Sequence, residues 1–181
     1  MKTFNGKMAV APLMLVAAAS VAAVEPPPPT PQVPTEIAAM LKEHLGRWRT
    51  EGQWISHGKA QSAAATWECK AAVGGIGNVC TWHHEWSDRA PDSALEIMGY
   101  DEDLKMLSIT RVGESGLIGT ATTTVRGNTM IGRWESVENG KTSIGFNEII
   151  VKAPGEWVQH MTIDVDGKRT TEMNTTHHRL K

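Results

Sequence analysis

His83, His84 and Glu85 are consecutive and belong to the residue types that bind metal ions or move protons. Imidazole and carboxylate groups are ligands of Zn²⁺, and together they make an acid–base pair. Adjacent side chains of a β-strand point to opposite faces, so His83 and His84 cannot share one ion. A site would therefore need residues from several strands. The residues that such a site would draw on are His84, His160, His177, His178, Glu148 and Glu172.

Sequence motifs of familiar enzyme classes are missing from this chain. It has no Gly-x-Ser-x-Gly, no phosphate-binding glycine loop and no His-Glu-x-x-His. The run Gly74-Gly75-Ile76-Gly77 is followed by no helix start, which makes it a hairpin turn instead of a nucleotide loop. An enzyme that uses an interior histidine stays an alternative, without catalytic residues assigned.

Tryptophan is the second unusual feature, with seven Trp against two Phe and one Tyr. An indole buries a large apolar area and carries an N–H that needs a partner. A wall of such residues suits a flat or apolar ligand, and it equally suits a barrel filled by its own side chains. The candidate wall consists of Trp54, Trp67, Trp82, His84, Trp86, Trp134 and Met161.

Turn signals recur every ten to fifteen residues between Gly46 and Lys181, beginning with His57-Gly58 and ending with Asp166-Gly167. Nine such signals divide this region into ten segments with strand-like patterns. The sequence therefore predicts an all-β fold, an antiparallel up-and-down barrel of about ten strands. A short amphipathic helix over residues 35–45, capped by Thr35, precedes it and should close one end.

Two cysteines fix the pairing of one hairpin. Cys69 and Cys80 lie equally far from a turn centred between Gly74 and Gly75, so they should face each other across neighbouring strands. In an oxidising compartment they should form a disulfide, worth about 2.5–3 kcal/mol under the chain-entropy model. By alternation, Trp67 shares the face of Cys69, while Trp82, His84 and Trp86 share the face of Cys80. That aromatic face should be the interior.

The first residues resemble an export signal. Residues 1–23 contain basic, apolar and small-residue stretches in the order of a signal peptide, residues 24–35 form a proline-rich linker, and residues 36–181 form the barrel domain. This predicts a periplasmic or secreted protein with no stable membrane insertion after cleavage. The mature chain keeps sixteen basic and twenty acidic residues, a net charge of −4, and nothing in it indicates binding to nucleic acid.

Gly46 and Trp48 follow the expected helix, and Arg179 lies in the last expected strand. In this arrangement they resemble the signature of the lipocalin-like barrels. The resemblance implies a structural role, in which the late arginine lies over the early indole.

A narrower resemblance is to the exported bacterial proteins of domain of unknown function 1579. It covers about residues 36–180, with Leu45-Gly46-Arg47-Trp48, Gly99-Tyr100-Asp101 and Thr176-His177-His178-Arg179 among the matching stretches. This family implies a lipocalin-like barrel and no established activity. The haem-binding nitrobindins share the architecture and hold iron through a histidine of the last strand. Here His177 and His178 are the candidates for that position, and no cofactor is otherwise expected.

The sequence as a whole predicts an exported barrel that binds a small apolar or aromatic ligand. The alternatives are a filled barrel with a structural or partner-binding role, and a haem-binding barrel. The identity of the ligand and the oligomeric state stay open.

Overall fold

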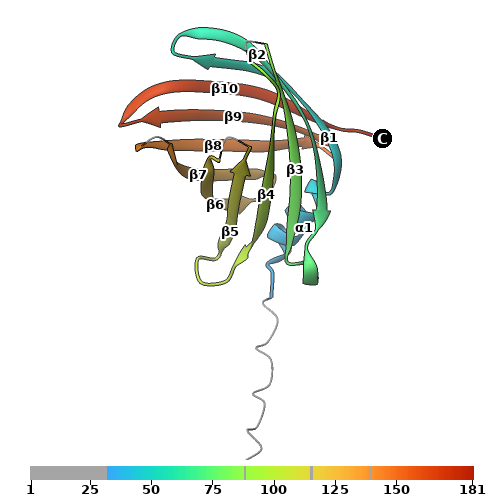
Figure 1. Ribbon diagram of the computed structural model, residues 1–181. Helices are drawn as coiled ribbons and strands as arrows, with labels where there is room; N and C mark the ends of the chain where they lie inside the picture. Colours follow the sequence, from blue (N-terminus) through green and yellow to red (C-terminus); the bar gives the residue numbers. More distant parts are fainter. Residues whose placement is uncertain (1–31, 88, 115, 139) are drawn as a thin grey trace, which may run out of the picture. The chain divides into compact units, whose positions relative to one another are not determined.

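The computed structural model describes residues 32–181 with the exception of residues 88, 115 and 139 (Figure 1). The signal peptide predicted for residues 1–23 and most of the linker predicted for residues 24–35 lie outside this part of the chain. Within the described part, no helix is both long enough and apolar enough to cross a membrane.

One helix and ten strands form the fold. The helix α1 spans Thr35–His44. The strands are β1 (Gly46–Ser56), β2 (Lys59–Ala71), β3 (Gly77–Trp86), β4 (Asp92–Asp101), β5 (Met106–Gly113), β6 (Ile118–Arg126), β7 (Thr129–Glu138), β8 (Lys141–Ala153), β9 (Glu156–Val165) and β10 (Lys168–Arg179).

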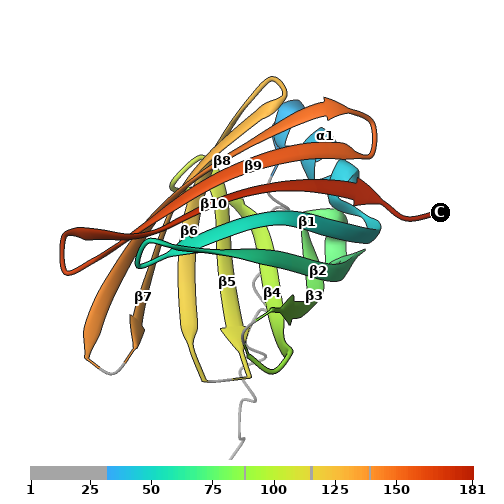
Figure 2. The same ribbon diagram turned by 90° about the horizontal axis from the view of Figure 1, so that it is seen from above.

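Every strand pairs with its neighbours in the chain, and β1 also pairs with β10, so the sheet closes on itself. All these pairings are antiparallel. Figure 2 shows the strands following one another around the barrel. The predicted all-β up-and-down barrel is confirmed, and each of the nine turn signals connects two consecutive strands.

The hairpin of β2 and β3 has the predicted register. Cys69 is the direct partner of Cys80, and the two form a disulfide. Both sulfur side chains are buried. The same register places Trp67 opposite Trp82, so the aromatic face points inward, while His83 and Glu85 on the other face are exposed.

The helix closes one end of the barrel, where it contacts β3 and β6. Ile37, Met40 and Leu41 are buried there, as the amphipathic pattern predicted. The predicted cap was wrong, because Thr35 is already helical and Pro34 occupies the capping position without a side-chain hydrogen bond. His44, and not Leu45, completes the buried face, since the helix ends at His44.

Trp48 is the centre of this closed end, with none of its surface exposed. Its ring is stacked on Trp67 at 5.0 Å between centroids and lies 4.3 Å from Trp157. Its indole N–H donates to the carbonyl oxygen of His44 at 3.0 Å. These contacts bind the helix end to the first strand.

Gly46 and Arg179 support Trp48 from either side. Gly46 has a φ of +103°, a conformation that only glycine adopts without strain, and it lets the chain turn from the helix into β1. The Arg179 guanidinium lies 4.9 Å from the centroid of the Trp48 ring and also bonds to the Glu43 carboxylate at 3.0 Å. The cation–π contact implied by the lipocalin-like resemblance is therefore present.

Candidate functional site

A row of stacked rings runs along the inner face of β3. His84 lies between Trp82 and Trp86, at centroid distances of 5.9 Å and 5.5 Å and interplanar angles of 10° and 24°. Trp82 in turn is stacked on Trp67 at 4.8 Å. The aromatic row therefore connects the closed end of the barrel with its opposite end, which we call the mouth.

The remaining residues of the predicted wall lie partly at the floor of the barrel and partly nearer the mouth. Trp67 is buried among the rings of the closed end, so it belongs to the floor. Trp54 lies near the mouth, with its ring edge-on to Trp86 at 5.5 Å. Trp134 and Met161 are partly exposed and point inward from β7 and β9.

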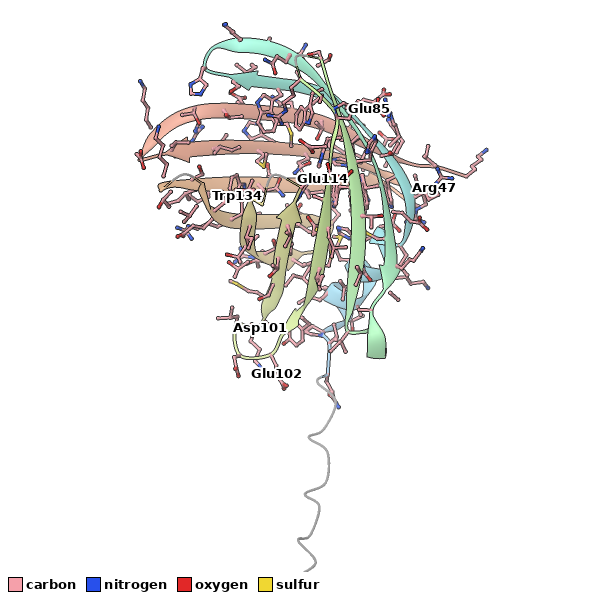
Figure 3. The ribbon with its side chains drawn as sticks, in the orientation of Figure 1. Arg47, Glu85, Asp101, Glu102, Glu114 and Trp134 are labelled. Atoms are coloured by element: carbon pink, nitrogen blue, oxygen red, sulfur yellow. A yellow bond between two sulfur atoms is a disulfide. The ribbon has the colours of Figure 1, made fainter. Side chains whose placement is uncertain are left out.

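Trp134 lies flat against Gly145 of the neighbouring strand. A Cβ atom added to Gly145 would come within 1.8 Å of the Trp134 Nε1 atom. A larger residue at this position would therefore push the indole into the interior. Figure 3 shows Trp134 within the ring of strands, whereas Arg47 and Glu85 lie on the outer side of the wall.

Three inward-facing charged residues accompany the aromatic row and were not among the predicted site residues. Asp92 and Glu96 come from β4 and Arg111 from β5. Their inward direction follows from the register, since Glu96 is the direct partner of both Cys80 and Arg111, and Asp92 is the partner of His84. Ionisable residues on the inside of a barrel are costly unless they are paired or have a function.

A chain of hydrogen bonds fixes these groups to one another. The Asp92 carboxylate accepts a hydrogen bond from the Trp86 indole N–H at 2.9 Å, and its other oxygen lies 2.6 Å from His84 Nδ1. The Arg111 guanidinium bonds to His84 Nε2. Because an arginine can only donate, Nε2 is the acceptor, and the proton of the neutral imidazole resides on Nδ1.

Burial changes the acid–base behaviour of this group. It lowers the pKa of His84, and the neighbouring Arg111 charge acts in the same direction, while the bond to Asp92 opposes both. Burial also raises the pKa of Glu96, against the opposing effects of Arg111 and the nearby Trp82 indole. The ion pair between Arg111 and Glu96 is loose, with 4.0 Å between the nitrogen and the oxygen.

Solvent reaches the inside of the barrel at this point. Although Arg111 points inward, 37% of its side chain is exposed, and Asp92 shows a similar exposed fraction. Trp86 and Trp54 beside them are also only partly buried. By contrast, Trp48 and Trp157 at the closed end have 0% and 1% of their surface exposed. The barrel is thus packed at the helix end and accessible at the mouth.

The two histidines considered for haem have other surroundings. His177 is buried at the floor, where its Nδ1 lies 2.8 Å from the Thr50 hydroxyl and its Nε2 lies 2.9 Å from the Gln159 amide oxygen. His178 is exposed on the outer face. An axial role for His177 would take one ring nitrogen away from its present hydrogen-bond partner in the packed floor, and His178 points away from the interior. These residues do not fit a haem inside the barrel.

The convergence of metal-binding residues considered from the sequence is wrong. His160 and Glu148 are exposed on the outside of the barrel. His160 bonds there to Asn174 at 2.8 Å and lies 3.9 Å from Glu172. Among the described residues, no group of three or more His, Cys, Asp or Glu side chains is placed to hold a metal ion.

A hollow of about 710 Å³ lies on the outer surface, over β1 to β5. Outward-facing residues such as Thr66, Thr81, Leu95 and Val112 line it. It is open to solvent, and none of Asp92, Glu96 and Arg111 is among the residues that line it. The inward-facing cluster is therefore the stronger candidate for a binding site.

Comparisons with known proteins agree with this fold and give no family. No family model matches the chain, and no curated protein matches its sequence. Solved structures do match it. The S-type phycobiliprotein lyase CpeS from Guillardia theta is 12% identical, with a TM-score of 0.58 over 81% of this chain and 93% of that chain. Rv2717c from M. tuberculosis is 15% identical, with a TM-score of 0.58 over 80% of this chain and 98% of that chain.

At such low identity the likeness concerns the fold alone. Both structures share the ten-stranded antiparallel barrel with this chain. The membership of domain of unknown function 1579 stays a prediction. The chain is an all-β, lipocalin-like barrel.

Proposed function

We propose that this protein binds a small molecule with a flat, largely apolar body in the mouth half of the barrel. The single observation that carries the proposal is the solvent-accessible row of Trp82, His84 and Trp86, held rigid by the bonds to Asp92 and Arg111. Rings that are fixed in place but partly exposed offer a preformed surface for another flat molecule. The site would sit above a packed floor, which limits the depth of entry.

Export is part of this proposal. A disulfide such as Cys69–Cys80 is typical of proteins in oxidising compartments, and it agrees with the export signal predicted from residues 1–23. We therefore propose a carrier or sensor of the periplasm or the extracellular space. The resemblance to domain of unknown function 1579 supports a barrel of this kind and adds no activity.

The test is a fluorescence titration with N-phenyl-1-naphthylamine, a neutral aromatic probe. We expect one probe per barrel and quenching of tryptophan emission. Ala121 points inward, directly opposite Trp134, so the substitution Ala121→Trp should fill the interior and weaken binding at least tenfold. Thr120→Trp is the matched control, because the adjacent residue is exposed and points outward.

Equal binding by wild type, Ala121→Trp and Thr120→Trp would place the probe on the outer surface and contradict the proposal. Failure of the wild type to bind would favour a filled barrel with a structural or partner-binding role. Thermal unfolding of each variant, followed by circular dichroism, distinguishes a blocked site from a misfolded chain.

A further inference from the structure

Arg111 is an inward-facing cation in the mouth half of the described barrel, and most of its hydrogen-bonding capacity is unused among the described residues. A guanidinium carries five N–H donors. Among the described residues, Arg111 makes one hydrogen bond, to His84 Nε2, and its nearest carboxylate, Glu96, is 4.0 Å away. Although it points inward, the Arg111 side chain keeps 37% of its surface exposed.

The orientation of this guanidinium is fixed before any ligand arrives. Its central carbon lies 4.8 Å from the centroid of the Trp82 ring. The guanidinium also bonds to His84, and His84 in turn bonds to Asp92. A preorganised donor loses little conformational entropy on binding and so gains affinity.

Small residues leave room beside Arg111. Its direct partner on β6 is Gly119, and the next inward residue on that strand is Ala121. A Cβ atom added to Gly119 would meet its nearest neighbour at 3.8 Å, an ordinary contact distance. On the β6 side, therefore, the inward-facing side chains next to Arg111 are no larger than a methyl group.

The charges around the site leave Arg111 as the group that lacks a close counter-ion. The carboxylate of Asp92 is bonded to His84 and Trp86 and lies 3.8 Å from Arg89, whose guanidinium covers the Trp86 ring at the mouth. Burial favours the neutral form of Glu96, the other carboxyl group beside Arg111. A guanidinium whose ion pair is this loose keeps parallel N–H donors that match one carboxylate.

We propose that Arg111 binds a carboxylate group of the ligand, so that the natural ligand is a flat monoanionic carboxylic acid. The carboxylate would lie against the guanidinium on the β6 side, with the apolar body along Trp82, Trp86 and Trp134. This inference rests on the proposed function and adds the chemical class of the ligand. A doubly charged phosphate would pair best with two free cations, and the second guanidinium near the site, that of Arg89, already lies 3.8 Å from the Asp92 carboxylate.

The experiment is isothermal titration calorimetry at pH 7 with three probes that share one ring system: 2-naphthoate, 2-naphthamide and 2-naphthyl phosphate. We expect the wild type to bind 2-naphthoate at least tenfold more tightly than the neutral amide and than the phosphate. Arg111→Gln should weaken naphthoate binding ten- to a hundredfold and change amide binding by less than threefold. Arg133→Gln is the control, since Arg133 is exposed on the outer face.

Two more variants keep the test decisive. Arg111→Lys keeps the positive charge but lacks the parallel N–H donors of a guanidinium. It should lose naphthoate affinity by an intermediate factor, and this result does not depend on whether the glutamine variant folds. Glu96→Gln removes the competing acid and should tighten naphthoate binding two- to tenfold.

The outcomes separate the two proposals. Equal binding of naphthoate and naphthamide by the wild type, both blocked by Ala121→Trp, would retain the binding function and overturn the carboxylate assignment. Tighter binding of 2-naphthyl phosphate than of 2-naphthoate by the wild type would overturn the proposal that the ligand is a monoanion. Failure of all three probes to bind would overturn both proposals.

Discussion

Acidification from pH 7 to pH 4 should cost this barrel about 6 kcal/mol of its free energy of unfolding. The cause is a pair of histidines at the closed end, His44 and His177, whose pKa values burial lowers from 6.5 to about 4. In the unfolded chain both imidazoles take up a proton as the pH falls below 6.5, whereas in the folded barrel they stay neutral until about pH 4. Protons therefore bind preferentially to the unfolded chain in this range.

Burial holds these histidines neutral, and the neutral rings still make hydrogen bonds in the floor. His44 donates from Nδ1 to the carbonyl oxygen of Met40 at 2.9 Å, and its ring lies 4.3 Å from Trp157. His177 donates from Nε2 to the Gln159 oxygen and accepts at Nδ1 from Thr50. A second proton on either ring would put a charge into the buried floor, where it loses its hydration. At pH 4 each histidine lowers the free energy of unfolding by about 3 kcal/mol, whereas the total stability of a typical domain is about 5–15 kcal/mol.

Urea unfolding of the wild type at pH 7, 5.5 and 4, followed by tryptophan fluorescence, measures this loss. His177→Gln keeps polar atoms near Thr50 and Gln159 but does not titrate, so it should remove about half of the pH dependence. His178→Gln, on the outer face of the same strand, should leave it unchanged. Glu96 acts in the opposite direction, because its raised pKa favours folding at acid pH. A wild-type stability that is flat between pH 7 and 4 would contradict this assignment.

Trp48→Ala should destabilise the barrel by about 3–5 kcal/mol, the cost of replacing a large buried aromatic residue by alanine. The indole has none of its surface exposed and touches Trp67, Trp157 and the end of α1. Its loss would leave a cavity and remove the surface on which Arg179 rests. The helix would lose its main attachment to β1.

Trp54→Ala is the matched control for this experiment. The residue lies on the same strand and points to the same side, but at the accessible mouth, where it is only partly buried. We expect a loss below about 2 kcal/mol, since little of the vacated space would be sealed from water. Urea unfolding at pH 7 measures both variants, and equal losses would show that the two ends of the barrel are packed alike.

Much of the fold is predictable from the sequence because its turns are marked by glycine, proline and acidic residues. The disulfide hairpin is the clearest example. The symmetrical spacing of Cys69 and Cys80 about the glycine turn gives both the register and the inward direction of Trp82, His84 and Trp86. The contact of Trp48 with Arg179 follows from the resemblance to lipocalin-like barrels.

The charged part of the site is not predictable in this way, because β4 has an inverted pattern. Leu95 and Ile97 are exposed on the outer face, while Glu96 between them is buried inside. An alternation of polar and apolar residues ordinarily places the apolar set in the core. Here the direction is imposed by the pairing of Glu96 with Cys80 on β3.

A signal for these residues does exist in the sequence. Once Cys80 is known to point inward, the register across the next two hairpins gives the direction of Glu96 and Arg111. The centre of each turn must be known to one residue, because a shift by one would turn every side chain to the other face. Proline-containing turns such as the one between β3 and β4 do not fix that centre from sequence alone.

The direct test of ligand binding inside the barrel is a nuclear magnetic resonance titration of the seven tryptophan indole N–H groups with 2-naphthoate. Binding in the mouth half predicts large shifts for Trp82, Trp86 and Trp134 and small ones for Trp48 and Trp157 at the closed end. Shifts confined to backbone amides that line the outer hollow, such as those of Thr66, Thr81 and Leu95, would contradict a binding site inside the barrel. An unchanged spectrum at millimolar naphthoate would contradict it as well.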